Sequence, residues 1–344
     1  MRRFEGYMKG INLGGWISQY AEYDKDHFDS FITKSDIDYI ASLGFDHVRV
    51  PVDYKVIQDE DGNIIESGFS YLENCLGWCT DNNLNMVIDL HECYGYTFDP
   101  LQKTDKTAFF YNESQKQRFL DLWKEIAGRF GKYGSRIAFE PLNEVQDESV
   151  KNEWNELIRR FMETVRPIAP DTYVITGGVW NNHVSAVKWL DKPYDDKTVY
   201  NFHCYEPLVF THQGAYWIDE MPHDFRTTYP KTLSDYRTES EYALNGQYSG
   251  AVELDISEPG PGFFKDLFLP AIEIAEANDA MLYCGEYGVI DIADNASKLR
   301  WLKDIHSVFE KYGIGHALWN YKEKDFGLVD QRFEEIREDF LEIV

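Results

Sequence analysis

The chain has 344 residues, 43% of them hydrophobic, and 60 acidic against 34 basic residues give it a formal net charge of −26. Such an acidic surface repels phosphate backbones and anionic lipid, so nucleic acid, acidic polymers and membrane surfaces are poor candidate partners, whereas a neutral substrate is compatible with it. No apolar run approaches the roughly 20 residues of a membrane span, and residues 1–16 lack the apolar core of a signal peptide, so we expect a cytoplasmic protein, or a secreted one if a leader has been removed.

Short apolar runs rich in β-branched and aromatic residues recur along the chain, and their continuous hydrophobicity is typical of strands buried on both faces. We expect eight strands, beginning at Lys9, Asp46, Asn85, Ile137, Tyr173, Thr198, Met281 and Gly315. Helical repeats lie between them, and we expect helices within residues 35–44, 114–131, 150–170, 263–279, 295–313 and 334–344.

Alternating strands and helices predict an α/β fold, a (β/α)8 TIM barrel that spans residues 1–344 as a single catalytic domain. A doubly wound open sheet is the alternative, but the NLGGW stretch after the first strand is not the glycine-rich phosphate loop usual in that fold. The sixth and seventh strand starts, Thr198 and Met281, lie 83 residues apart, about twice the usual gap in this chain. We therefore expect residues 207–262 to form a small inserted subdomain at the carboxyl ends of the strands.

Polar and aromatic residues stand near the ends of six predicted strands, where the active sites of such barrels lie. They are Arg49, His91, Asn143, Glu144, His203, Tyr205, Glu286 and Trp319. Aromatic residues also follow other strands, among them Trp16 and Trp180, and flat rings beside polar groups suit sugars, which combine apolar faces with hydroxyls. Glu140 lies deeper in its strand, and we expect it to be a buried structural carboxylate paired with a cation or with hydrogen-bond donors.

Glu144 and Glu286, from the fourth and seventh strands, are expected to face each other across the barrel mouth. Two opposed carboxylates can cleave an acetal, because one protonates the leaving oxygen while the other attacks the anomeric carbon. Catalytic metal is the competing chemistry, but the first strand has no HxH pair, and HExxH and GxSxG motifs are absent. The five cysteines form no CxxC pair, so we expect free thiols. We also expect no metal and no cofactor.

Six motifs in barrel order resemble those of glycoside hydrolase family 5: HVRVP at Arg49, IDLH at His91, LNEV at Asn143 and Glu144, NFHCYEP at His203 and Tyr205, YCGEYG at Glu286, and ALWNYK at Trp319. The resemblance covers the whole chain and is closest to compact single-domain endo-β-1,4-glucanases, or cellulases, with an insertion after the sixth strand. Two departures are Glu92, where many relatives have a second histidine, and Pro141, where relatives often have an apolar residue.

The resemblance implies a retaining, endo-acting hydrolase of β-1,4-glucosidic bonds in cellulose-like or mixed-linkage β-glucans. Glu286 is then the nucleophile and Glu144 the acid/base; Asn143 binds the 2-hydroxyl of the reacting sugar, and Trp319 forms its stacking floor. Alternatives within the family are a β-mannanase, a xyloglucanase or an exo-β-1,3-glucanase. Outside enzymes, the alternative is an inactive barrel that only binds sugar. The expected partner is a β-glucan polysaccharide or oligosaccharide, with no nucleic acid and no membrane, and we expect a monomer.

Overall fold

The computed structural model describes residues 1–246 and 260–344, and its centre is a closed barrel in which eight parallel strands follow one another in chain order. The strands are β1 (Lys9–Asn12), β2 (His47–Asp53), β3 (Asn85–Glu92), β4 (Ile137–Glu140), β5 (Tyr173–Gly177), β6 (Thr198–Cys204), β7 (Met281–Tyr287) and β8 (Gly315–Leu318). The predicted barrel is therefore confirmed. Seven strands begin at the predicted residue, and β2 begins at His47, one residue later than predicted.

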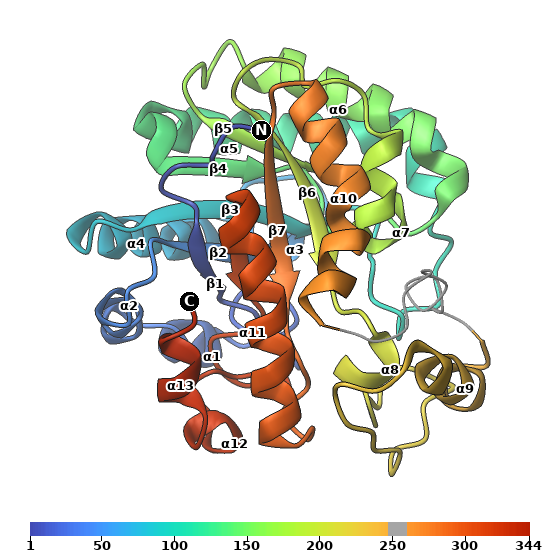
Figure 1. Cartoon of the computed structure of the whole chain (residues 1–344). Coiled ribbons are helices and arrows are strands. Elements are labelled where there is room, and N and C mark those ends of the chain that lie inside the picture. The colour runs from blue at the N-terminus through green and yellow to red at the C-terminus, as the bar shows by residue number, and fades with distance from the viewer. Residues whose placement is uncertain (247–259) are drawn as a thin grey trace.

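Helices surround the barrel (Figure 1). They are α1 (Lys25–Ser30), α2 (Lys34–Ser42), α3 (Tyr54–Ile57), α4 (Glu66–Asp81), α5 (Glu113–Phe130), α6 (Lys151–Val165), α7 (Val179–Asn182), α8 (Leu208–Thr211), α9 (Leu233–Ala243), α10 (Pro261–Ala277), α11 (Asn295–Tyr312), α12 (Gln331–Glu334) and α13 (Arg337–Leu341). The single helix expected in residues 334–344 is wrong, because the chain there forms the end of α12 and the separate helix α13. Within the described residues, no helix is long and apolar enough to cross a membrane.

The barrel interior is built in layers along its axis. At the amino ends of the strands, an apolar plug closes the barrel, and there the rings of Phe4 and Tyr7 stack at 4.3 Å between centroids. Above this plug the interior is polar, and it contains the fully buried Arg49 and Glu140. The register between β6 and β7 shifts at Phe202/His203, just below the mouth. Such irregularities re-aim side chains, so the strand ends present polar groups to the opening.

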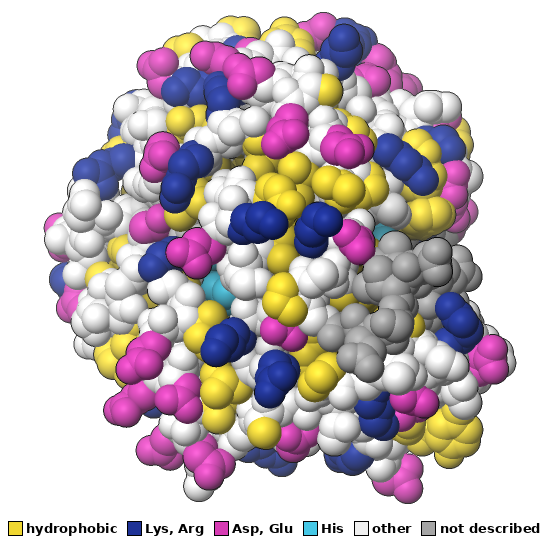
Figure 2. Space-filling view, viewed as in Figure 1, with side chains coloured by type: hydrophobic (Ala, Val, Ile, Leu, Met, Phe, Trp, Pro, Cys, Tyr) yellow, Lys and Arg dark blue, Asp and Glu magenta, His cyan; other side chains and the backbone are white. Residues whose placement is uncertain are grey.

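The segment after β6 leaves the barrel at the end toward which the strand arrows point, where α8 and α9 lie (Figure 1). Of the predicted 207–262 insertion, residues 247–259 lie outside the described residues, so the boundary of the subdomain stays a prediction. On the face drawn in Figure 2, acidic and basic side chains are intermixed over the surface. The five cysteines are free thiols, as expected, and all of them are buried.

Candidate active site

Arg49 organises the polar layer below the mouth. It lies within β2 rather than at its end, and its guanidinium donates to both oxygens of Glu140 at 2.7 and 3.1 Å and to Glu286 Oε1 at 2.8 Å. Asn201 also donates to Glu140, at 2.9 Å. Because this bidentate pair satisfies a carboxylate with no solvent exposure, Glu140 has the buried structural role that the sequence predicted.

The same guanidinium contacts a third carboxylate, that of Asp89, whose Oδ2 lies 3.0 Å from Arg49 Nη2. One cation cannot balance three buried carboxylates, and burial raises the pKa of Asp89 to about 7, although Arg49 lowers it. Asp89 Oδ2 lies 2.5 Å from Nδ1 of His91, and burial lowers the pKa of that histidine to about 3. The dyad therefore holds an uncharged imidazole in one orientation at the mouth.

Asp89 Oδ1 has no partner among the described residues, and two further polar atoms here lack one as well: His91 Nε2 and Asn143 Nδ2. Both side chains are almost fully buried, and Asn143 is held by its carbonyl oxygen, which accepts from Arg49 at 2.9 Å. An unpaired buried polar atom is unfavourable, so such atoms indicate a place where a ligand supplies the missing bond.

Glu144 follows β4 in a turn that holds its backbone in the left-handed region, at φ 43°. Tyr96 fixes this turn, because its hydroxyl donates to the Glu144 carbonyl at 2.8 Å and accepts from the Gln146 amide at 3.0 Å. The carboxylate accepts from Asn181 Nδ2 at 3.2 Å and lies 2.7 Å from His203 Nδ1. Burial raises the pKa of Glu144, and the bond from Asn181 partly offsets that rise.

His203 donates from Nδ1, because its other nitrogen, Nε2, lies 3.3 Å from the Asn182 side-chain nitrogen and serves there as an acceptor. Burial lowers the pKa of His203 to about 4, so this imidazole is neutral near pH 7. His203 thus orients Glu144 as a hydrogen-bond donor and adds no positive charge.

Glu286, on β7, faces Glu144 across the mouth. Arg49 donates to its Oε1, and the Tyr205 hydroxyl donates to its Oε2 at 2.9 Å, so both oxygens are bound by donors that stabilise negative charge. Ligating atoms of Glu144, His203 and Glu286 all lie within 4.8 Å of one another. A carboxylate oxygen of Glu144 therefore lies within 4.8 Å of one of Glu286, which is compatible with the spacing of about 5 Å between the carboxyl groups of retaining glycosidases.

The same three residues could offer a cation three ligand atoms, two carboxylate oxygens and one imidazole nitrogen. Two of these groups are already engaged by donors, since His203 Nδ1 bonds to Glu144 and Arg49 bonds to Glu286. Arg49 already compensates the negative charge of Glu286, so no metal is needed for that purpose. These hydrogen bonds therefore suit two reacting carboxylates.

Trp319, at the end of β8, lies parallel to the His91 ring, with 6.0 Å between centroids and 3° between planes. The position of Trp319 explains why residue 14 in the NLGGW stretch is glycine, because a Cβ here would come within 2.5 Å of the Trp319 ring. Only glycine allows the β1 loop to approach the indole this closely. The first and last strands thus position one flat ring at the mouth.

The structure corrects one predicted site residue. Trp16 has no solvent exposure, and its Nε1 donates to the Phe28 carbonyl at 2.8 Å, so the ring belongs to the core and cannot stack on a sugar. Trp180 is 43% exposed and packs edge-on against Trp189 at 4.6 Å. Trp180 is thus a partly exposed ring in the segment after β5, and its contact with sugar stays a prediction.

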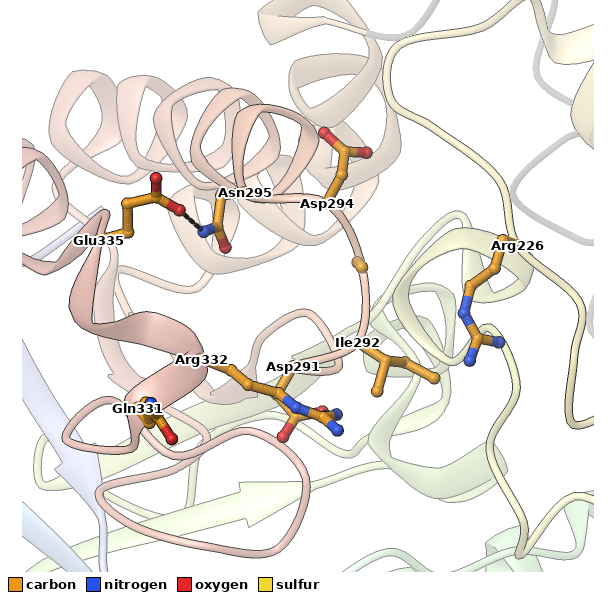
Figure 3. A pocket seen from close by; sticks show the side chains of 9 residues that line it. Arg226, Asp291, Ile292, Asp294, Asn295, Gln331, Arg332 and Glu335 are labelled. Atoms are coloured by element: carbon orange, nitrogen blue, oxygen red, sulfur yellow. Dashed lines mark hydrogen bonds and ion pairs between the residues drawn. The ribbon is translucent and has the colours of Figure 1, made fainter.

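A hollow of about 450 Å³ lies between the loop after β7, helices α11 and α12, and Arg226 of the segment after β6 (Figure 3). Its charged groups are already paired: Arg332 bonds to Asp291 at 2.8 Å, and Asn295 donates to Glu335 at 2.6 Å. Arg226 donates to backbone carbonyls of its own segment. This hollow holds none of the residues that converge at the mouth.

Sequence reasoning missed several residues of the site. Asp89 and Asn201 each lie two positions before a predicted site histidine, so strand periodicity already placed them on the same face. Asn181 and Asn182 carried no such signal, because a run of left-handed residues at Trp180, Asn181 and Asn182 sets their orientation.

Known proteins resemble this chain over most of its length. Residues 7–325 match the family model described as Cellulase (glycosyl hydrolase family 5). The chain is 40% identical over 314 residues to Cellodextrinase A from Ruminococcus flavefaciens, covering 91% of this chain and 85% of that protein. It is 39% identical over 342 residues to Endoglucanase C from Acetivibrio thermocellus, covering 98% of each. Cel5A from Thermotoga maritima, solved in complex with cellobiose, matches with a TM-score of 0.75 and 24% identity over 99% of each chain, a likeness of fold.

Proposed function

The chain belongs to the cellulases of glycosyl hydrolase family 5, and from this premise we propose that Glu286 and Glu144 carry out its reaction. That reaction is the retaining, endo-acting hydrolysis of β-1,4-glucosidic bonds in β-glucans. The observation that carries the assignment is a pair of opposed carboxylates with oxygens within 4.8 Å of each other, held by different hydrogen-bond partners.

In the first step, Glu286 attacks the anomeric carbon while Glu144 protonates the leaving glycosidic oxygen. Glu286 is suited to attack because Arg49 and Tyr205 hold its carboxylate by hydrogen bonds at 2.8 and 2.9 Å. Glu144 is suited to give a proton because burial raises its pKa above the ordinary value. The products are a covalent glycosyl-enzyme and a free sugar chain.

In the second step, the ionised Glu144 takes a proton from water, and this water attacks the anomeric carbon and releases Glu286. Two inversions at the same carbon retain its configuration. His203 holds Glu144 in place through both steps, because a neutral imidazole donates equally well before and after the proton moves. The unpaired atoms His91 Nε2 and Asn143 Nδ2 bind hydroxyls of the reacting sugar, and Trp319 stacks on its ring.

Two variants test the roles of the carboxylates. Glu286→Gln abolishes turnover on every substrate while the fold is kept, because no nucleophile remains. Glu144→Ala loses activity on cello-oligosaccharides but keeps much of it on aryl cellobiosides, whose leaving groups need no acid. Substantial turnover by Glu286→Gln, or equal losses on both substrates in Glu144→Ala, would overturn the assignment.

Product sizing on a panel of soluble glucans and mannans tests the polymer and the mode of attack. We expect mixed-length products from β-1,4-glucan and mixed-linkage β-glucan, with little release from β-mannan or β-1,3-glucan. We also propose that the enzyme acts as a monomer. A molar mass near twice that of the chain in light scattering would contradict this.

A further inference from the structure

The loop after β3 and the segment after β6 meet in space. Lys103, in the β3 loop, forms an ion pair with Asp219, in the segment after β6, at 2.8 Å. On the other side, Trp217 of the same segment contacts Phe326, in the loop after β8, at 6.4 Å between ring centroids. One stretch, residues 216–219, therefore touches two loops that belong to different parts of the barrel.

The barrel order shows where this stretch runs. Strands follow one another around a closed ring, so β4 and β5 separate β3 from β6, β7 separates β6 from β8, and β1 and β2 separate β8 from β3. The loops that follow β3, β6 and β8 therefore start at three points spread around the barrel axis. A segment that starts at β6 and contacts the loops after β3 and β8 therefore joins three sides of the open end of the barrel.

The side chains of the two reacting glutamates have low solvent exposure, as expected if residues 216–219 lie above them. The side chain of Glu144 is 13% exposed and that of Glu286 is 7% exposed, although both stand at the open end of the barrel. Tyr216 supports the placement as well, because charges of Asp325 and Asp99, which lie in the β8 and β3 loops, raise the pKa of its hydroxyl in addition to burial.

Glu92, the departure from the family pattern, holds the β3 loop in the position that the ion pair needs. It accepts hydrogen bonds from Thr97 and from Gln102, at 3.3 Å for the latter. The Lys106 ammonium group holds the same loop together, because it donates to the carbonyls of Thr97, Asp99 and Gln102 at 2.8, 2.9 and 3.1 Å. The loop is thus folded around its own polar groups, and Lys103 projects from a fixed base.

The segment after β6 is anchored on its other side. The Ile290 amide, after β7, donates to the Thr211 carbonyl at 2.9 Å, and the Tyr229 hydroxyl donates to Asp304 of α11 at 2.9 Å. His212 packs against Tyr205, which binds Glu286, at 4.9 Å. The tip at residues 216–219 therefore extends from a fixed body toward the β3 loop.

We propose that residues 216–219 and the β3 loop form an arch over the catalytic mouth, closed by the Lys103–Asp219 ion pair, and that this arch selects single soluble β-1,4-glucan chains over crystalline cellulose. The proposal rests on the proposed function and adds its substrate class. A single chain passes under an arch or enters when it opens, whereas chains packed in a flat crystal surface cannot reach the carboxylates beneath it.

The Lys103–Asp219 ion pair is weak because both side chains are exposed to solvent. The arch can therefore open for the middle of a polymer chain, as endo attack requires. The side chains of Lys103 and Asp219 are 71% and 68% exposed, and exposed ion pairs change an equilibrium constant only about two- to fivefold. The arch therefore opens readily for a soluble polymer and closes again over it. Because it holds ground state and transition state alike, its loss raises KM and leaves kcat unchanged.

Charge reversal tests the arch. Lys103→Glu and Asp219→Lys are each expected to raise KM for cellopentaose about two- to fivefold with unchanged kcat, and to raise the rate on crystalline cellulose relative to cellopentaose. The double variant Lys103→Glu/Asp219→Lys restores the pair with reversed sign and is expected to return both values to those of the wild type. Lys34→Glu is the matched control for Lys103→Glu, since Lys34 forms a 2.6 Å ion pair with Asp38 on α2 and its reversal changes the net charge by the same amount and sign.

Unchanged KM and unchanged substrate ratio in both single variants would overturn the arch, as would a double variant that is no closer to wild type than its parents. An equal effect of Lys34→Glu would show that net charge is responsible and would also overturn it. These outcomes differ from failure of the proposed function, in which the wild type itself hydrolyses neither cellopentaose nor soluble β-glucan.

Discussion

Replacing Arg49 with methionine tests the central idea that one guanidinium organises the site. Methionine has a similar length and no charge, so it fills the space while removing every hydrogen bond of the guanidinium. Glu140, which has no solvent exposure, loses its bidentate partner at 2.7 and 3.1 Å, and Glu286 loses its donor at 2.8 Å. Asp89 is less affected near neutral pH, because burial already raises its pKa to about 7 and the loss of Arg49, which lowers this pKa, favours its protonated form.

The expected cost follows from breaking a buried ion pair, which is about 3–5 kcal/mol when one partner is removed. The unfolding entropy of about 2.1 cal/mol/K per residue amounts to roughly 0.7 kcal/mol/K for this chain, so Tm falls by about 4–7 °C. Catalysis suffers more than stability, because Glu286 loses both its charge partner and its fixed orientation, and we expect kcat/KM to fall at least about 100-fold.

Scanning calorimetry and kinetics on cellopentaose measure both effects, with Arg3→Met as a control, since Arg3 forms an exposed pair with Glu5 at 3.5 Å. Glu140→Gln should lower Tm in the wild type but raise it in the Arg49→Met background, because there it removes an uncompensated buried charge. A Tm loss below about 1 °C in Arg49→Met, or a further loss on adding Glu140→Gln, would refute the reasoning.

Two further predictions follow from local geometry. Gly14→Ala places a Cβ 2.5 Å from the Trp319 ring, so it should reduce the free energy of unfolding by about 1–3 kcal/mol and raise KM for cellopentaose. Gly77→Ala on α4, where no atom of a neighbouring element in the described part of the chain lies within 4 Å of the added atom, should instead stabilise by up to about 1 kcal/mol in urea titrations; equal effects of the two changes would contradict the steric argument. Asn181→Gly suits the local φ of 55° and removes a hydrogen bond that lowers the pKa of Glu144. We therefore expect this pKa to rise in the variant, so that the acid stays protonated to higher pH. The alkaline limb of the kcat/KM profile then moves to higher pH. An alkaline limb that stays in place or moves to lower pH would show that Asn181 does not tune the acid.

The sequence alone was sufficient for the barrel, for reasons that lie in neighbouring residues. Continuous apolar runs mark strands buried on both faces, and their alternation with helical repeats leaves few arrangements other than a closed parallel barrel. Closure then gathers all strand ends at one opening, so the positions of His91, Glu144, His203 and Glu286 in the chain already predicted that they would meet. Glu140 was predicted to be structural by the cost of a buried charge.

The tertiary structure decided what depends on contacts between residues far apart in the chain. It placed Asp89 against Arg49 and buried Trp16, because nothing near either residue in sequence shows what packs against it. It set the left-handed turn that brings Asn181 to Glu144, since side-chain direction there depends on backbone angles that apolar periodicity does not encode. It also brought Lys103 to Asp219, 116 residues away, because only the closed ring fixes how far a loop reaches across its mouth.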